Sequence, residues 1–158
     1  MTWRTSSLDQ ALLRVVREEL SRYGDAATVR PEWGQVPQMW FVEVEPANAQ
    51  AARLSVAFDG DDLLNINVGD TWFEVFPFRE SGIDDFRRVV RAIFAGRIEE
   101  AGGGREGGGT ARIYTDTGRP RTVGAAFPWP WQWRMHDRYE RYGEPVPPGS
   151  RCATSESG

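Results

Sequence analysis

Residues 64–76 read Leu-Asn-Ile-Asn-Val-Gly-Asp-Thr-Trp-Phe-Glu-Val-Phe, two alternating runs joined by Gly69 and Asp70. A Gly-Asp pair between such runs is typical of a two-residue β-hairpin turn, and the turn fixes which residues lie opposite each other. Ile66 then faces Phe73, and both side chains point to the same side of the sheet. We expect this side to lie in the core.

The other side of the same hairpin carries amide, acidic and aromatic side chains. Alternation places Asn67 opposite Trp72 and Asn65 opposite Glu74. This side is expected to lie outside the core.

Three further strands are expected before the hairpin, over residues 28–33, 39–45 and 53–59. The first contains Pro31, which has no N–H, so we expect it at an edge of the sheet. The apolar residues of the third run share a face with those of the hairpin only if an odd number of residues, most simply three, connects the two.

Two helices are predicted from apolar residues at helical spacing, over residues 8–23 and 83–94, with Gly24 and Gly96 at their C-terminal ends. The nine residues expected in one common core are Leu12, Val16, Leu20, Val56, Ile66, Phe73, Phe86, Val90 and Ile93.

The chain after the second helix predicts further strands and one short helix. A hairpin is expected from residues 97–101 and 110–116, with a further strand at 121–126 and a short helix over 134–142. The whole predicts an α+β domain over residues 1–142, with an antiparallel sheet of five to seven strands and two helices packed on one face. The Pro-, Gly- and Ser-rich residues 143–158 are expected to form a disordered tail.

Composition excludes several functions. All 19 basic residues are Arg. Without Lys the chain forms no Schiff base and has no Walker-type phosphate lysine. The single Cys152 has no partner for a disulfide, and we find neither an apolar leader nor a run long enough to cross a membrane. We therefore expect a cytoplasmic protein, no membrane association and no cofactor.

Charge is uneven along the chain. Residues 32–85 carry eleven acidic residues and only two Arg, a local balance of −9. An acidic block repels phosphate backbones, so nucleic-acid binding is not expected. A basic protein is the partner that this charge favours.

Two short motifs are present but are rejected because the surrounding sequence does not fit them. The glycines at 102, 104 and 107 satisfy a dinucleotide-binding pattern, but a strand follows where that pattern requires a helix. Asp59, Asp61, Asp62 and Asp70 are explained by turns rather than by a metal.

No catalytic residue is predicted from the acidic and histidine positions. His136 and Asp137 are neighbours that would not face one site together on a helix. Glu99 and Glu100 are adjacent in a strand, so they point to opposite faces, and we interpret them as charges on an edge strand.

The predicted site is the outer face of the sheet. Its proposed binding residues are Phe41, Glu43, Asn65, Asn67, Trp72 and Glu74. Aromatic rings among acids and amides suit a protein-binding surface, although antiparallel sheets often expose a mixed polar face. The Trp-rich residues 127–133 would either cover this face as an intramolecular lid or leave it open as a ligand platform.

Residues 64–76, followed by a helix that closes in residues 90–100, resemble a pattern in small uncharacterised α+β proteins of high-GC bacteria, some of which are regarded as immunity proteins of toxin systems. The resemblance covers the central third and assigns no functional residue. It implies a non-catalytic protein-binding module, such as an immunity-type inhibitor of a basic toxin. The alternative is a small-molecule-binding protein or enzyme with a pocket between the sheet and the Trp-rich residues.

Overall fold

The computed structural model describes residues 7–35, 38–101, 109–124 and 137–147. Its helices are α1 (Ser7–Leu20) and α2 (Ile83–Phe94), with short 3-10 turns η1 (Ser21–Tyr23) and η2 (Glu80–Gly82). Its strands are β1 (Ala27–Gln35), β2 (Gln38–Pro46), β3 (Leu54–Phe58), β4 (Leu64–Val68), β5 (Thr71–Val75), β6 (Ile98–Ala101), β7 (Thr110–Tyr114), β8 (Pro120–Gly124) and β9 (Asp137–Arg138). The glycine-rich loop after Ala101, the Trp-rich residues, His136 and Cys152 lie outside the described residues.

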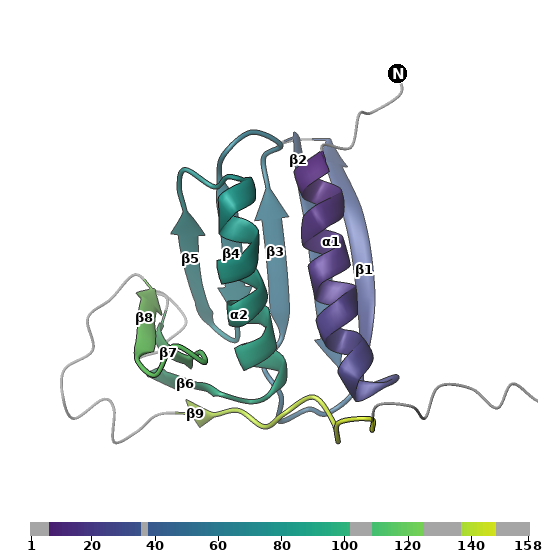
Figure 1. Ribbon diagram of the computed structural model, residues 1–158, viewed down its shortest axis with the longest axis vertical. Coiled ribbons are helices and arrows are strands. Elements are labelled where there is room, and N and C mark those ends of the chain that lie inside the picture. Colours follow the sequence, from purple (N-terminus) through teal and green to yellow (C-terminus); the bar gives the residue numbers. More distant parts are fainter. Residues whose placement is uncertain (1–6, 36–37, 102–108, 125–136, 148–158) are drawn as a thin grey trace, which may run out of the picture.

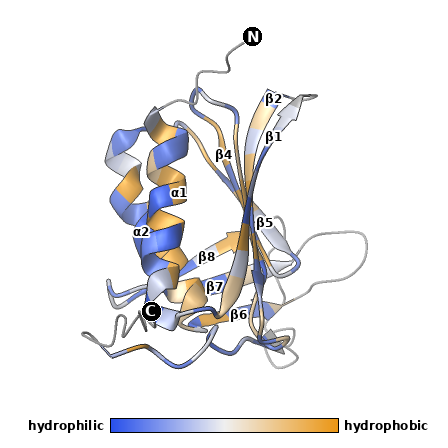
Figure 2. Ribbon diagram, turned by 90° about the vertical axis from the view of Figure 1, so that its right-hand side faces the viewer, coloured by the Kyte–Doolittle hydropathy of each residue, from blue (hydrophilic) through white to orange (hydrophobic). Residues whose placement is uncertain are grey.

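The main sheet is antiparallel throughout, in the order β1-β2-β3-β4-β5. Both helices lie side by side on one face of this sheet (Figure 1), and a quarter turn shows them as a separate layer (Figure 2). The predicted α+β class, with five strands in the main sheet and two helices on one face, is therefore confirmed.

The predicted hairpin register is also confirmed. Ile66 pairs with Phe73, and Asn67 pairs with Trp72. All nine residues expected in the core belong to one buried cluster between the helices and the sheet. The apolar side of the hairpin thus determines which face the helices cover.

The connection between β3 and β4 has the expected odd parity but is five residues long, because Phe58 pairs with Leu64. Asp59 explains its shape. One carboxylate oxygen accepts hydrogen bonds from the N–H groups of Asp61 (2.9 Å), Asp62 (3.1 Å) and Leu63 (3.1 Å). The acidic turn is thus built by local side-chain to backbone bonds.

A second antiparallel sheet has the order β8-β7-β6-β9 and lies beside the lower end of β5 (Figure 1). It contains the predicted hairpin of β6 and β7 and the further strand β8. Our interpretation of Glu99 and Glu100 as edge-strand charges is wrong, because β6 pairs on both sides, with β7 and β9. Glu100 is buried, with 3 % of its surface exposed.

The helix predicted over residues 134–142 is also wrong for the described part of that range. After β9, the chain runs extended along the bottom of the molecule (Figure 1). Its N–H groups bond elsewhere: Glu140 donates to the Gln50 carbonyl and Tyr142 to the Phe94 carbonyl, both at 2.9 Å. Long-range backbone bonds and the burial of Tyr142 outweigh the weak local preference for a helix.

The described first part of the expected tail, residues 143–147, follows a bend at Tyr142 and Gly143. The Val146 N–H donates a 2.7 Å hydrogen bond to the Arg22 carbonyl in η1, directly after α1. The disorder expected over residues 143–158 stays a prediction, because residues 148–158 lie outside the described part. Within the described ranges, neither helix is long and apolar enough to cross a membrane.

Candidate functional site on the outer face of the sheet

The sheet register brings all six predicted site residues to the face opposite the helices. One row across the five strands reads Arg30, Glu43, Ser55, Asn67 and Trp72. The next row reads Glu32, Phe41, Ala57, Asn65 and Glu74. The predicted grouping on one face is therefore geometrically sound, while its role in binding stays a prediction.

The two aromatic residues of the prediction are not neighbours. Phe41 lies on β2 and Trp72 on β5, three strands apart, which separates them by roughly 14 Å at the usual strand spacing. Between them the middle strands present small side chains, including Ser55 and Ala57. We call the strip of smaller side chains between these two aromatic residues the trough.

Exposed apolar surface is concentrated at the β5 side of this trough. Trp72 exposes 45 % of its surface, and Phe76, directly after β5, exposes 69 %. Phe41 is partly buried on the other side. The sequence already placed Phe76 opposite Leu63, on the side of Trp72 and Glu74, but Phe76 was not included among the predicted binding residues.

A hollow of about 220 Å³ opens at one end of the trough. Its side chains come from β2, β3, β4 and the residue before β3, and they include Glu43, Glu45, Arg53, Ser55 and Asn67. Arg53 forms a 2.7 Å ion pair with Glu45. Glu43, exposed at the rim of the hollow, gives the trough a further negative charge.

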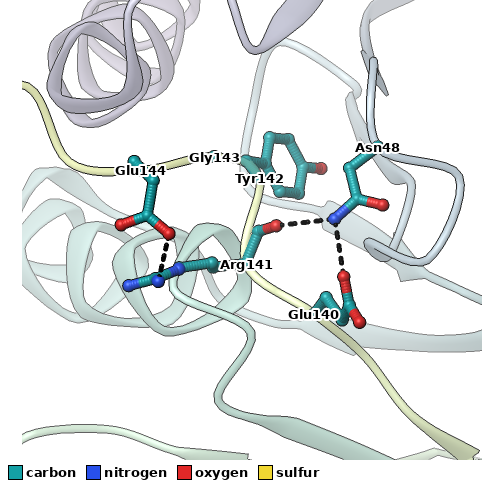
Figure 3. A pocket seen from close by; sticks show the side chains of 6 residues that line it. All are labelled: Asn48, Glu140, Arg141, Tyr142, Gly143 and Glu144. Carbon is teal, nitrogen blue, oxygen red and sulfur yellow. Dashed lines mark hydrogen bonds and ion pairs between the residues drawn. The ribbon is translucent and has the colours of Figure 1, made fainter.

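A larger hollow of about 550 Å³ lies against the described residues after β9, 139–147, which we call the C-terminal segment (Figure 3). Its polar groups contact one another. Asn48 donates to Glu140 at 3.0 Å and to the Arg141 carbonyl at 3.1 Å, while Arg141 pairs with Glu144. These bonds fix the segment to the loop after β2, so we interpret this hollow as a structural junction.

Metal binding finds no support among the residues that the structure describes. They contain no group of three or more His, Cys, Asp or Glu side chains placed to hold an ion. The aspartates singled out in the sequence are divided, since Asp70 follows β4 whereas Asp59, Asp61 and Asp62 precede it.

The buried Glu100 is the polar group that sequence reasoning missed. Its carboxylate accepts hydrogen bonds from the Asp70 N–H (2.9 Å), the Tyr139 hydroxyl (2.5 Å) and the Thr71 hydroxyl. It therefore joins the β4–β5 turn, the second sheet and the C-terminal segment. Neither hollow described above is lined by it, and we regard it as a structural joint.

Glycines make this close approach possible. A Cβ atom on Gly69 would lie 2.6 Å from Glu100 Oε2, and one on Gly109 would lie 2.6 Å from Thr71 Oγ1. Such distances leave no room for a side chain, so the glycines directly after β4 and directly before β7 were a signal of this junction in the sequence.

Comparisons with protein-family models, with curated proteins and with solved structures give no match for this chain.

Proposed function

We propose that this protein is a non-catalytic binding module of the bacterial cytoplasm, and that the outer face of its main sheet engages a basic protein. One observation supports this most directly: Trp72 is exposed on an acidic face that neither helix covers, and Phe76, directly after β5, is more exposed still. A solvated sheet face needs neither ring, whereas desolvated aromatic residues dominate the energetics of protein interfaces.

Charge favours a basic partner. The outer face carries the carboxylates of Glu32, Glu43, Glu45 and Glu74, against the guanidinium groups of Arg30 and Arg53. One of these arginines is already paired with Glu45. The remaining negative potential would raise the rate at which a basic partner arrives.

Size favours a protein over a small molecule. Pockets for small ligands usually enclose roughly 300 to 1,000 Å³. The hollow in the trough has about 220 Å³, and its lining includes Glu43, Ser55 and Asn67 of the outer face. An immunity-type inhibitor of a basic toxin is the specific form of this function that we favour, and a toxin-like reading frame beside the gene would support it.

Affinity capture from the native cell tests the proposal. The wild-type chain and Trp72→Ala would be used as baits at low and high salt, with Val146→Ala as control, because Val146 is 40 % exposed and distant in sequence from the sheet. We expect a basic protein that is retained at low salt by the wild type and the control, and that is lost with Trp72→Ala. A partner whose retention ignores both salt and the Trp72 substitution would contradict the proposal.

A further inference from the structure

The hydrogen-bond pattern of the main sheet shows which backbone groups β5 offers to solvent. At the two ends of the β3–β4 pair, the Gly69 N–H donates to the Arg53 carbonyl at 3.1 Å, and the Asp59 N–H donates to the Leu63 carbonyl at 3.2 Å. In an antiparallel pair, directly bonded residues alternate with residues that are not bonded. The odd-numbered residues of β3 and β4 therefore bond each other.

The same alternation of bonded and unbonded residues determines which groups of β5 bond to β4. The even-numbered residues of β4 turn toward β5, where their partners are Thr71, Phe73 and Val75. The N–H and C=O groups of Trp72 and Glu74 consequently point away from the sheet. β5 ends the strand order, and among the described residues no backbone hydrogen bond is made by these outward groups.

The second sheet approaches β5 without occupying this edge. The Arg121 guanidinium lies 5.7 Å from the centre of the Phe73 ring, and a Cβ atom on Gly124 would lie 3.0 Å from Thr71 Cγ2. Phe73 and Thr71 both carry side chains on the core face. The described part of β8 thus covers β5 from the helix side and leaves the groups of Trp72 and Glu74 facing outward.

The opposite edge of the sheet is protected, which makes the β5 edge distinctive. The Ala47 N–H donates to the Ala26 carbonyl at 2.8 Å, so even-numbered residues of β1 bond β2 and the nitrogen of Pro31 points outward. A proline at this position offers no donor, and its ring obstructs an incoming strand. β5 has neither a proline nor a basic side chain within its five residues.

We infer that β5 receives an extended segment of the partner protein as a sixth, antiparallel strand, with an Arg or Lys of that segment opposite Glu74. The inference rests on the proposed function and specifies its partner. Apolar side chains two residues to either side of the cation would lie beside Trp72 and Phe76, the two most exposed large apolar residues described. Strand addition of this kind takes affinity from backbone bonds and specificity from alternate side chains.

A second copy of this chain is a poorer occupant of the same edge. Antiparallel pairing of two β5 strands about Glu74 would place two Glu74 carboxylates directly opposite each other. Like charges in that position are destabilising. A cationic segment from a different protein places an opposite charge beside Glu74, which no register of two β5 strands can do, because β5 has no basic residue.

A synthetic peptide tests the inference directly. The probe is the capped heptapeptide Thr-Val-Thr-Arg-Thr-Val-Thr, titrated against the full chain at physiological salt by calorimetry and followed by amide hydrogen exchange. Binding is expected to slow the exchange of the Trp72 and Glu74 N–H groups. Methylating the backbone nitrogen of the central Arg removes a donor to β5 and should weaken binding at least about tenfold.

Two matched controls accompany the probe. Methylating the nitrogen of the Thr before the Arg alters a group that points away from β5, so the affinity should change less than about threefold. Glu74→Arg should reverse the preference toward a peptide with Glu in place of Arg, whereas Glu43→Arg, roughly 14 Å away on β2 and beyond the Debye length, should not.

Several results would overturn strand addition: no binding of the probe at millimolar concentration, equal effects of the two methyl groups, or unprotected Trp72 and Glu74 amides. These are distinguishable from failure of the proposed function. If a captured partner depends on Trp72 but leaves both amides unprotected, the outer face remains the binding site and the edge does not. If no captured partner depends on Trp72, the function itself fails.

Discussion

The Tyr139 hydroxyl donates a 2.5 Å hydrogen bond to Glu100 Oε2, which joins the segment after β9 to an interior strand of the second sheet. The other carboxylate oxygen of Glu100 reaches the main sheet through Asp70 and Thr71. One buried side chain therefore holds three parts of the fold together.

Removing this joint is expected to destabilise the protein strongly. Glu100→Ala leaves the Asp70 N–H and two hydroxyl groups without their acceptor, one of them on the buried Thr71, and we expect a loss of at least about 3 kcal/mol in the free energy of unfolding. Tyr139→Phe should cost about 1 to 3 kcal/mol. Chemical denaturation of both variants and of the double variant would measure their coupling. The control is Tyr114→Phe, which removes a similar bond to the neighbouring, less buried Glu99.

Two adjacent residues of β5 should lose very different amounts of stability when each is replaced by Ala. Phe73 lies in the core and Trp72 on the outer face. Phe73→Ala is expected to lower the free energy of unfolding by roughly 3 to 5 kcal/mol, because it leaves a cavity. Trp72→Ala should cost clearly less, about 1 to 2 kcal/mol, because almost half of the Trp72 surface is already exposed in the folded protein and no closed cavity forms. Similar losses in thermal or urea unfolding would show that the faces are wrongly assigned.

Glu19 is expected to couple stability to acid pH. Burial alone would raise its pKa, but hydrogen bonds from Arg91 and Arg87 and the charge of Arg22 outweigh burial, so the pKa lies below its ordinary value of 4.5. A lowered folded-state pKa contributes stability that is fully present above the unfolded pKa and is lost as pH falls through the folded one.

The measurement compares the urea unfolding of Glu19→Gln with that of the wild type, at neutral pH and at about pH 3. We expect the variant to be less stable by roughly 1 to 3 kcal/mol at neutral pH, below the cost for fully buried pairs because the guanidinium groups are partly exposed. The deficit should shrink in acid. Glu18→Gln, which removes an exposed partner of the same Arg87, should show little of either effect.

Binding kinetics should separate the aromatic residue from the charges of the outer face. Once a partner is in hand, Trp72→Ala is expected mainly to raise the dissociation rate, because a desolvated ring acts in the bound complex. Reversing Glu43 and Glu74 to Arg should mainly slow association, most visibly at low salt. Surface plasmon resonance at two salt concentrations measures both rates. Charge reversal that changes only dissociation would contradict the steering role.

Pro31 is expected to keep the β1 edge from pairing. Pro31→Thr restores an outward N–H to β1, which is a long edge strand. Because this edge could then pair with another chain, we expect concentration-dependent association in sedimentation velocity. Thr28→Val, in the same strand, raises apolarity without adding a donor and serves as control. A monomeric Pro31→Thr protein would show that another feature protects this edge.

Local patterns predicted the main sheet well because its turns fix its register. Gly69 and Asp70 fix which residues of β4 and β5 lie opposite each other, the apolar side of the hairpin then faces the core, and sequential hairpins order all five strands. The same register placed the six predicted site residues on one face. Its consequence, that Phe41 and Trp72 lie on separate sides of a trough, follows from strand order rather than from alternation.

What could not be predicted depends on contacts between distant parts of the chain. Alternation correctly places Glu99 and Glu100 on opposite faces of β6. It does not predict that Glu100 is buried, because the burial comes from β9 and the β4–β5 turn, which pack against it. Residues 137–142 have too few apolar residues to show a period. Their extended path follows from bonds to Gln50 and Phe94, which no local pattern reveals.

The position of Tyr142 has a consequence for how the chain folds during synthesis. Its ring packs 4.5 Å from that of Phe94, and its hydroxyl donates to the Ala52 carbonyl at 2.6 Å, so it closes a core whose other members come earlier in the sequence. A ribosome releases both helices and the main sheet before this residue emerges. The nascent domain would therefore expose the end of α2 until Tyr142 has left the ribosome, and it would be most open to chaperones and proteases in that interval.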